Sequence, residues 1–295
     1  MQFPRPMLAC NERPTQSHLS QLLVGGPLLC TPKFDGIRCL VGDSDVVSRK
    51  LITIPNRSVV ATLQLHFAGQ KLDGELLTYT NGVLDDFNTV QSKIMSRTGA
   101  PDFKYMIFDA WNVNDDYQGR TGWLYTFIPE WGLVHERVLP EWAFTVDEVL
   151  ALEAKFIEQG WEGMIARTGR SPYKQGRSTM RESYMLKFKP FVDEEATVIG
   201  WEPLYHNANL QGRDELGYAK RSSHQENLIQ TGLLGALIVH NERWGIFKIG
   251  TGFTDLQRCN PDQYLHQTVT FKYQSNHSKD KPHAARFKAI RHPNI

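Results

Sequence analysis

The pattern of strands and helices along this chain changes near residue 190. Before that point, apolar runs of strand length alternate with stretches of helical periodicity. Beyond it, almost every apolar run is short and bounded by turn residues. A chain of 295 residues is long enough for two hydrophobic cores. We therefore expect an α+β domain over residues 1–190 and an all-β domain over residues 191–295, with residues 191–195 as a plausible hinge.

Two helices are predicted in the first part of the chain. The clearer one covers residues 146–159. Thr145 can cap its N-terminus, Glu148 three residues later can complete a capping box, and Gly160 can end it. The other lies within residues 85–97, where apolar side chains recur near helical spacing.

Five strands are predicted in the second part, over residues 196–201, 233–240, 246–249, 268–273 and 287–290, with a hairpin connection at 241–245. Five short strands in about a hundred residues fit an OB-type barrel. A polar stretch over residues 205–231 interrupts this pattern and is too long for an ordinary turn. Its composition alone favours a surface insertion.

Lys33 lies in a short loop between two strand-like runs, residues 28–30 and 37–41, and Gly36 permits a tight backbone there. A lysine at the end of a strand can attack phosphorus only after its amine loses a proton. Other cations or a metal must therefore lower its pKa from about 10.4. On this loop alone, an ordinary exposed lysine remains an equal alternative.

An ordered series of further segments accompanies the Lys33 loop. The series is Lys33-Phe34-Asp35-Gly36-Ile37-Arg38, Ser48-Arg49-Lys50 with Ile54-Pro55-Asn56, Leu72-Asp73-Gly74-Glu75-Leu76, Tyr105-Met106-Ile107-Phe108-Asp109, Glu162-Gly163-Met164-Ile165-Ala166-Arg167 and Leu186-Lys187-Phe188-Lys189. In order and spacing it resembles the covalent nucleotidyltransferase superfamily, and most closely the minimal ATP-dependent DNA ligases of viruses, phages and bacteria. The resemblance extends from about Cys30 to the end of the chain.

The resemblance implies a fold and an activity. The fold would be an α+β nucleotidyltransferase (ATP-grasp-like ligase) domain followed by an all-β OB-fold domain. The chain would be an enzyme that seals 3′-OH/5′-phosphate nicks in duplex DNA through a lysyl-AMP intermediate and adenylated DNA. ATP and Mg²⁺ (or Mn²⁺) would be its cofactors, and residues 205–231 would be a latch-like insertion that binds DNA.

The resemblance also implies catalytic residues, with Lys33 as the nucleophile. Lys187 and Lys189 are two residues apart on a predicted strand and so share a face, where they can hold the α-phosphate and lower the pKa of Lys33. Glu162 would help to hold the metal, since Mg²⁺ accepts few carboxylates together with phosphate oxygens and water. Read alone, Glu162 would be a surface charge.

Further residues are implied on the nucleotide side. Arg38 would lie against AMP, Glu75 would hydrogen-bond the ribose hydroxyls and share a face with Asp73, and Phe108 would stack on adenine. A core role for Phe108 in a buried strand is the alternative. Thr31 and Pro32 would border the adenine pocket, and Asp35 would lie near the sugar or the 3′-hydroxyl.

The DNA contacts are implied in the same way. Arg49 would sense the 5′-phosphate, Lys220 and Arg221 would contact DNA from the latch-like insertion, and Lys248 and Arg258 are candidate phosphate contacts. Arg291 matches the basic ending of the family only loosely, so whether it acts in the adenylation step stays open.

Charge and composition are compatible with this interpretation without establishing it. Residues 1–195 hold 21 Lys+Arg against 24 Asp+Glu, and residues 196–295 hold 12 against 8, so the excess of basic residues lies in the second part. An ordinary fluctuation would give the same numbers. No apolar run is long enough to span a membrane, and the four cysteines form no CxxC pair that would suggest zinc. We expect a cytoplasmic monomer whose partner is nicked duplex DNA.

Two rival functions stay open on the sequence. One is an RNA ligase or another covalent nucleotidyltransferase, which would share the same segments. The other is a non-catalytic nucleic-acid-binding protein, in which Lys33, Glu75, Glu162, Lys187 or Lys189 would be altered; all five are present.

Overall fold

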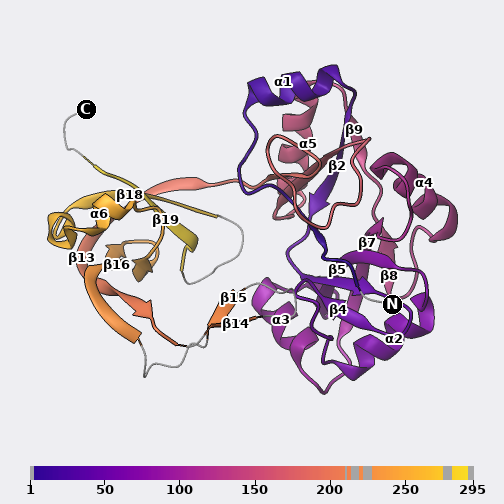
Figure 1. Cartoon of the computed structure of the whole chain (residues 1–295), viewed down its shortest axis with the longest axis horizontal. Coiled ribbons are helices and arrows are strands. Elements are labelled where there is room, and N and C mark those ends of the chain that lie inside the picture. The colour runs from indigo at the N-terminus through magenta and orange to yellow at the C-terminus, as the bar shows by residue number, and fades with distance from the viewer. Residues whose placement is uncertain (1–2, 210, 214–218, 222–227, 275–280, 292–295) are drawn as a thin grey trace. The chain divides into compact units, whose positions relative to one another are not determined.

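In a computed structural model the chain forms two compact units, Met1–Lys189 and Pro190–Ile295 (Figure 1). The structure describes residues 3–209, 211–213, 219–221, 228–274 and 281–291. Among these described residues, no helix is long and apolar enough to cross a membrane.

The first unit contains a four-stranded antiparallel sheet that carries Lys33. Its order is β12-β10-β2-β9, built from Leu186–Phe188, Gly163–Thr168, Leu28–Lys33 and Glu141–Ala143. Helix α5 (Val146–Glu158) packs on it, and helix α1 (Gln16–Val24) packs against α5. Val149 and Phe156 of α5 are buried there in one core cluster with Leu28 of β2. This core fixes the end of β2, where Lys33 lies.

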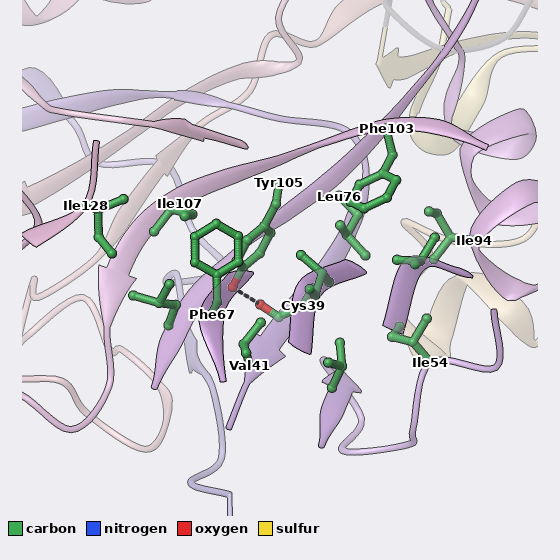
Figure 2. Close-up of a cluster of buried hydrophobic side chains, with 14 of the residues drawn as sticks. Cys39, Val41, Ile54, Phe67, Leu76, Ile94, Phe103, Tyr105, Ile107 and Ile128 are labelled. Carbon is green, nitrogen blue, oxygen red and sulfur yellow. Dashed lines mark hydrogen bonds between the residues drawn. The ribbon is translucent and has the colours of Figure 1, made fainter. Parts of the chain in front are cut away.

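A second sheet in the same unit has the order β4-β3-β5-β7-β8, with β6 paired to β5. Its strands are Val46–Ser48, Ile37–Val41, Leu72–Thr80, Asp102–Ala110, His135–Arg137 and, for β6, Val83–Leu84. Helices α2 (Arg57–Phe67), α3 (Phe87–Met95) and α4 (Tyr117–Phe127) contact it. The core of this sheet is apolar, and within it the Tyr105 hydroxyl donates to the carbonyl of Cys39 at 3.0 Å (Figure 2). A short parallel pair, β1 (Met7–Leu8) and β11 (Gly176–Arg177), completes the unit.

The predicted helix over 146–159 corresponds to α5, with one difference at its start. The Thr145 hydroxyl accepts from the Glu148 N–H at 3.2 Å, as expected for an N-cap. The Glu148 carboxylate, however, accepts from the N–H of Phe144 at 2.7 Å, one residue before the cap, so the predicted capping box is incomplete. Gly160 has φ +88° just beyond the end of the helix, a conformation that glycine adopts without a steric penalty.

The second unit is a five-stranded antiparallel sheet of order β17-β16-β13-β18-β19. The strands are Gly245–Ile249, Leu228–Asn241, Val192–Asn207, Thr268–Gln274 and His283–Ile290. A bridge between Thr251 and Arg286 brings the two edges of the sheet together, as in a partly open barrel. Two short helices that the sequence did not predict, α6 (Asp255–Arg258) and η2 (Pro261–Tyr264), also lie in this unit.

The prediction of a hinge over residues 191–195 is wrong for most of that run. Val192 begins strand β13, and its neighbours through Glu195 pair residue by residue with β18. Acidic residues do not prevent this, because Asp193 forms an ion pair with Lys288 and the Glu194 carboxylate accepts from the Trp244 indole N–H at 3.0 Å.

The two ends of the polar stretch over 205–231 belong to barrel strands, and its middle forms a separate strand pair. Residues 205–207 still belong to β13 and residues 228–231 to β16. Between them, β14 (Gln211–Arg213) and β15 (Ala219–Arg221) form an antiparallel pair. Residues 210, 214–218 and 222–227 lie outside the described part of the chain.

Candidate active site

Lys33 is the last residue of β2 and is paired with Gly163 at the start of β10. The Lys33 carbonyl accepts from the N–H of Glu162 at 3.0 Å. Gly163 has φ +151°, and a Cβ atom there would lie 2.1 Å from the carbonyl oxygen of Phe188 on β12. Only glycine therefore lets these three strands approach so closely, and the approach places residues 33, 162 and 189 together.

Two ammonium groups converge on one carboxylate at this point. Glu162 is buried, and its two carboxylate oxygens form ion pairs with Lys33 and Lys189, one oxygen each. Lys187 pairs with Ile165, which on its other side pairs with Thr31 of β2. Since residues opposite each other share a face of a sheet, Lys187 and Thr31 lie on the same face as Lys33.

The pKa of Lys33 is lowered to about 8. Burial is the largest cause, and the positive charge of Lys189 lowers the pKa further, whereas Glu75 and Asp35 raise it. Burial likewise lowers the pKa of Lys189 to about 8. Both lysines can thus lose a proton near neutral pH, which a nucleophilic amine requires.

Arg38, Asp73 and Phe108 form the neighbouring part of the site. Asp73 is fully buried and accepts from Arg38 Nε at 2.5 Å and from Nη2 at 2.6 Å. The Arg38 guanidinium carbon lies 4.6 Å from the centre of the Phe108 ring. Burial disfavours the charge on Arg38, but Asp73 outweighs this effect and holds the pKa of Arg38 above its ordinary value.

Phe108 owes its place to a β-bulge. On β5, Asp73 pairs with Asp109 and the next residue, Gly74, pairs with Ile107, so Phe108 is the extra residue on β7. Its side chain is half-buried. Because the extra residue interrupts the alternation of faces along β7, the strand pattern alone could not decide whether Phe108 is a core residue or a ring that stacks on adenine.

Glu75 pairs with Arg38 across β3 and β5. Burial raises the pKa of Glu75 to about 7, although the charges of Arg38 and Lys33 act in the opposite direction. Gly36 lies against this strand, and a Cβ atom there would be 2.2 Å from the carbonyl oxygen of Leu76. Gly36 is therefore required by close packing of the Lys33 loop on β5.

Arg49, Arg177 and Lys187 form a cluster of cations that the sequence analysis found only in part. Burial lowers the pKa of Arg49 and of Lys187, and in both cases Arg177 is the next largest cause. The Arg177 guanidinium donates to the carbonyl of Ala9 at 2.6 Å. Arg177 was missed because its only signal is a basic residue after a glycine, which many surface turns share. Three neighbouring cations are suited to binding an anion such as phosphate.

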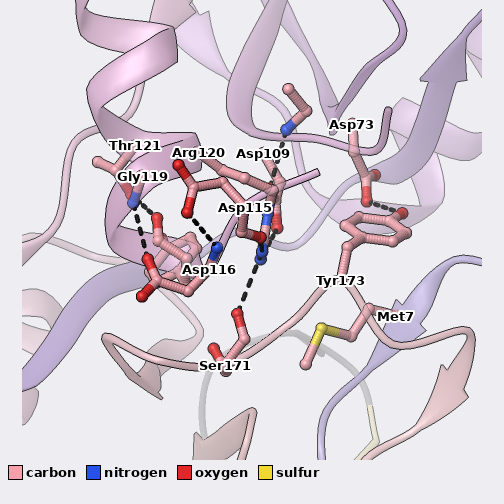
Figure 3. A network of polar contacts seen from close by, with 12 residues as sticks. Met7, Asp73, Asp109, Asp115, Asp116, Gly119, Arg120, Thr121, Ser171 and Tyr173 are labelled. Carbon is pink, nitrogen blue, oxygen red and sulfur yellow. Dashed lines mark hydrogen bonds and ion pairs between the residues drawn. The ribbon is translucent and has the colours of Figure 1, made fainter. Parts of the chain in front are cut away.

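A buried ion-pair network is centred on Asp109, the residue that follows Phe108. Asp109 is fully buried and contacts two guanidinium groups, Arg120 at 2.7 Å and Arg167. Arg120 also donates to the carbonyls of Asp115 at 2.8 Å and Ser171 at 3.1 Å (Figure 3). Asp109 and Arg167 were noted in the sequence as parts of the ordered series, but Arg120 was not.

Two of the candidate DNA contacts of the second unit, Lys248 and Arg258, are engaged within the chain. Lys248 forms an ion pair with Glu202. Arg291, whose part in the adenylation step the sequence leaves open, forms an ion pair with Glu195. Arg258 donates to the carbonyls of Leu234, Gly235 and Gly250 at 2.6 to 3.2 Å, so phosphate would have to compete with these acceptors. Lys220 and Arg221 lie on β15, but their side chains are outside the described part of the structure.

The donor groups at this site fit a nucleotide with a divalent cation better than a metal held by protein alone. Among the described residues, no three His, Cys, Asp or Glu side chains lie close enough together to hold a metal ion. The carboxylate of Glu162 is present beside the cations that phosphate oxygens would need. This is the donor set with which Mg²⁺ binds through one carboxylate, phosphate oxygens and water.

Comparison with known proteins gives a consistent result. Residues 6–189 match the family model described as the ATP dependent DNA ligase domain, and residues 230–291 match the DNA ligase OB-like domain. The structure of Chlorella virus DNA ligase-adenylate is 26% identical, with 97% of this chain and 99% of that chain covered and a TM-score of 0.55. A Lig E DNA ligase shares the fold, with a TM-score of 0.72, 20% identity and coverage of 96% and 99% of the two chains. These matches confirm the predicted fold class of a nucleotidyltransferase domain followed by an OB-fold domain.

A sequence relative gives a local match. The DNA ligase of African swine fever virus (strain Badajoz 1971 Vero-adapted) is 38% identical over 56 residues, which cover 19% of this chain. The match spans 13% of the length of the viral protein.

Proposed function

Because this chain belongs to the ATP-dependent DNA ligase family, we propose that it seals nicks in duplex DNA by three phosphoryl transfers that begin at Lys33. The observation that carries the proposal is the placement of Lys33 at the end of β2, half-buried and sharing the Glu162 carboxylate with Lys189, with its pKa lowered to about 8. A lysine in this setting can act as a nucleophile.

In the first transfer, the neutral amine of Lys33 attacks the α-phosphorus of ATP. A P–N bond forms, and the P–O bond to pyrophosphate breaks. Lys187 and Lys189 would neutralise charge on the phosphate oxygens, and Glu162, released from one of its ammonium partners, would help to hold Mg²⁺ (or Mn²⁺). The metal would supply further neutralisation of phosphate charge.

Arg38, Glu75 and Phe108 would hold the nucleoside during this step. Arg38 and Glu75 pair across neighbouring strands, where one offers donors and the other acceptors to the ribose hydroxyls. The half-buried ring of Phe108 would stack on adenine, and Thr31 and Pro32, which precede Lys33 on β2, would border the same pocket. Asp35 would lie near the sugar or the 3′-hydroxyl.

In the second transfer, the 5′-phosphate of the nick attacks the adenylyl phosphorus and the P–N bond breaks, which returns Lys33 as an amine. In the third, the 3′-hydroxyl attacks the 5′-phosphate and AMP leaves. Arg49, Arg177 and Lys187 form the cation cluster that would receive the 5′-phosphate. Lys220, Arg221, Lys248 and Arg258 remain proposed contacts to the DNA backbone.

The test of this proposal is nick sealing by the purified protein. A duplex with one 3′-OH/5′-phosphate nick should be joined with ATP and Mg²⁺ and not with GTP. The matched variants are Lys33→Ala, which should not join the nick, and Lys155→Ala, an exposed lysine paired with Glu141, which should. Joining only of nicks in RNA strands, or joining by Lys33→Ala, would contradict the proposal.

The proposal includes a monomer that works in the cytoplasm. Size-exclusion chromatography with light scattering, with and without a nicked duplex, tests the first part. One protein chain per nick is the expected result.

A further inference from the structure

The carboxylate of Asp73 receives a hydrogen bond from a residue one hundred positions away. Arg38 donates one hydrogen bond to each carboxylate oxygen of Asp73, and Oδ2 also accepts from the hydroxyl of Tyr173 at 2.6 Å. Figure 3 shows Tyr173 beside Asp73. Because Asp73 is fully buried, every donor it receives restricts its position, and the position of Asp73 in turn orients the Arg38 guanidinium.

Tyr173 also connects the two buried charge networks of this unit. Its ring centre lies 5.7 Å from the guanidinium carbon of Arg120, which is bound to Asp109 at 2.7 Å. Its hydroxyl is bound to Asp73 in the other network. Tyr173 is thus held from one side by a fully buried arginine while it holds the Asp73–Arg38 pair from the other.

The segment that carries Tyr173 reaches Arg38 by a second route. It continues into β11, whose Gly176 pairs with Met7 of β1. The carbonyl of Met7 accepts from Arg38 Nη2 at 3.3 Å. Arg38 is therefore positioned by β5 through Asp73, by β1 through Met7 and by the 173–177 segment through both.

We propose that Tyr173 is a positioning residue for the nucleotide step: its hydroxyl, acting through Asp73, fixes the orientation of the Arg38 guanidinium over the Phe108 ring. The inference rests on the proposed function, since it takes Arg38 and Phe108 as the groups that face the nucleotide. Tyr173 itself touches no reacting atom and acts only through another residue.

The experiment compares Tyr173→Phe with the wild type in the labelling of Lys33 by α-labelled ATP. The variant keeps the ring against Arg120 and loses only the hydroxyl. The ATP concentration at half-maximal labelling rate should rise about tenfold, with a smaller change in the maximal rate, because a hydrogen bond to a charged group is lost. The matched control is Tyr264→Phe in the second unit, which loses a hydroxyl contact to the Gln257 carbonyl at 3.2 Å and should leave the ATP dependence unchanged.

A double-mutant comparison tests the route through Asp73. If Tyr173 acts through that carboxylate, Tyr173→Phe should change the ATP dependence little when Asp73→Ala has already removed both side-chain acceptors. A full tenfold effect in the Asp73→Ala background would overturn the inference. So would an unchanged half-maximal ATP concentration in Tyr173→Phe, with or without a lower unfolding temperature, because the hydroxyl would then have a structural role only.

The two proposals fail in different ways. Wild-type protein that takes no label from ATP would contradict the proposed function itself. Wild-type protein that takes label, together with a Tyr173→Phe variant that takes it at the same ATP concentrations, would contradict only the role of Tyr173.

Discussion

The reactivity of Lys33 depends on the fraction of its amine that is neutral. Its pKa is lowered to about 8, first by burial and then by the charge of Lys189. The protonated form is unreactive, so the rate of Lys33 labelling should rise as the pH increases through about 8 and then level off. This profile is measured by single-turnover labelling at saturating ATP.

Removal of the Lys189 charge should move that profile to higher pH. In Lys189→Met, Lys33 loses a neighbouring positive charge and keeps the carboxylate of Glu162 to itself, and both changes favour the protonated amine. We expect a shift of about one pH unit upward. Lys155→Met is the control, because that lysine is exposed and paired only with Glu141. A shift to lower pH in Lys189→Met would show that the electrostatic account of Lys33 is wrong.

The Asp109 network should contribute to stability as well as to shape. Asp109→Asn leaves Arg120 and Arg167 buried without a counter-charge, which should lower the free energy of unfolding by about 3–5 kcal/mol. Asp193→Asn breaks an exposed pair with Lys288 and should cost less than about 1 kcal/mol. Urea unfolding of both variants measures the difference, and similar losses in the two would contradict the argument.

At the scale of elements, Gly163 controls the spacing between β10 and β12. In Gly163→Ala the new Cβ atom would lie 2.1 Å from the Phe188 carbonyl oxygen, and the alanine would have to adopt a φ of +151°. We expect a loss of about 2–4 kcal/mol in unfolding free energy, together with slower labelling of Lys33, because Lys189 follows Phe188 directly.

Gly160→Ala is the control that separates the backbone strain of a positive φ from the steric contact expected in Gly163→Ala. Gly160 also has a positive φ, +88°, but a Cβ atom there would meet nothing within 4 Å. This variant should lose only about 1 kcal/mol and keep its labelling rate. If Gly160→Ala were as destabilised as Gly163→Ala, strand spacing would not be the reason that residue 163 is glycine.

The elements also show what the sequence could and could not predict. Lys33, Glu162, Lys187 and Lys189 were predicted because the segments that carry them resemble those of the ligase family in order and spacing. Their local patterns alone would not have been enough, since Glu162 read alone is a surface charge. The contact between Tyr173 and Asp73 spans one hundred residues, and no local pattern reports it. Arg258 was interpreted as a candidate phosphate contact because of the family resemblance and its charge, whereas its three carbonyl acceptors come from the folded barrel.

At the scale of the whole molecule, the account requires contacts to the DNA backbone from basic residues of both units. If about six to ten phosphates are neutralised, affinity for a nicked duplex should fall by about 10³- to 10⁵-fold between about 50 mM and 200 mM salt. Fluorescence anisotropy with a labelled nicked duplex measures this slope. Affinity that does not change with salt would mean that phosphate contacts do not dominate binding.

The central claim is that Lys33 becomes covalently bound to AMP, and peptide mapping after reaction with ATP tests it most directly. The protein is incubated with ATP and Mg²⁺, digested, and analysed by mass spectrometry, with an excess of pyrophosphate added to half of the sample before digestion. The account predicts one adenylyl group on the peptide that contains Lys33, and its loss on addition of pyrophosphate. An adenylyl group on another residue, or no covalent adduct in a protein that still seals nicks, would contradict it.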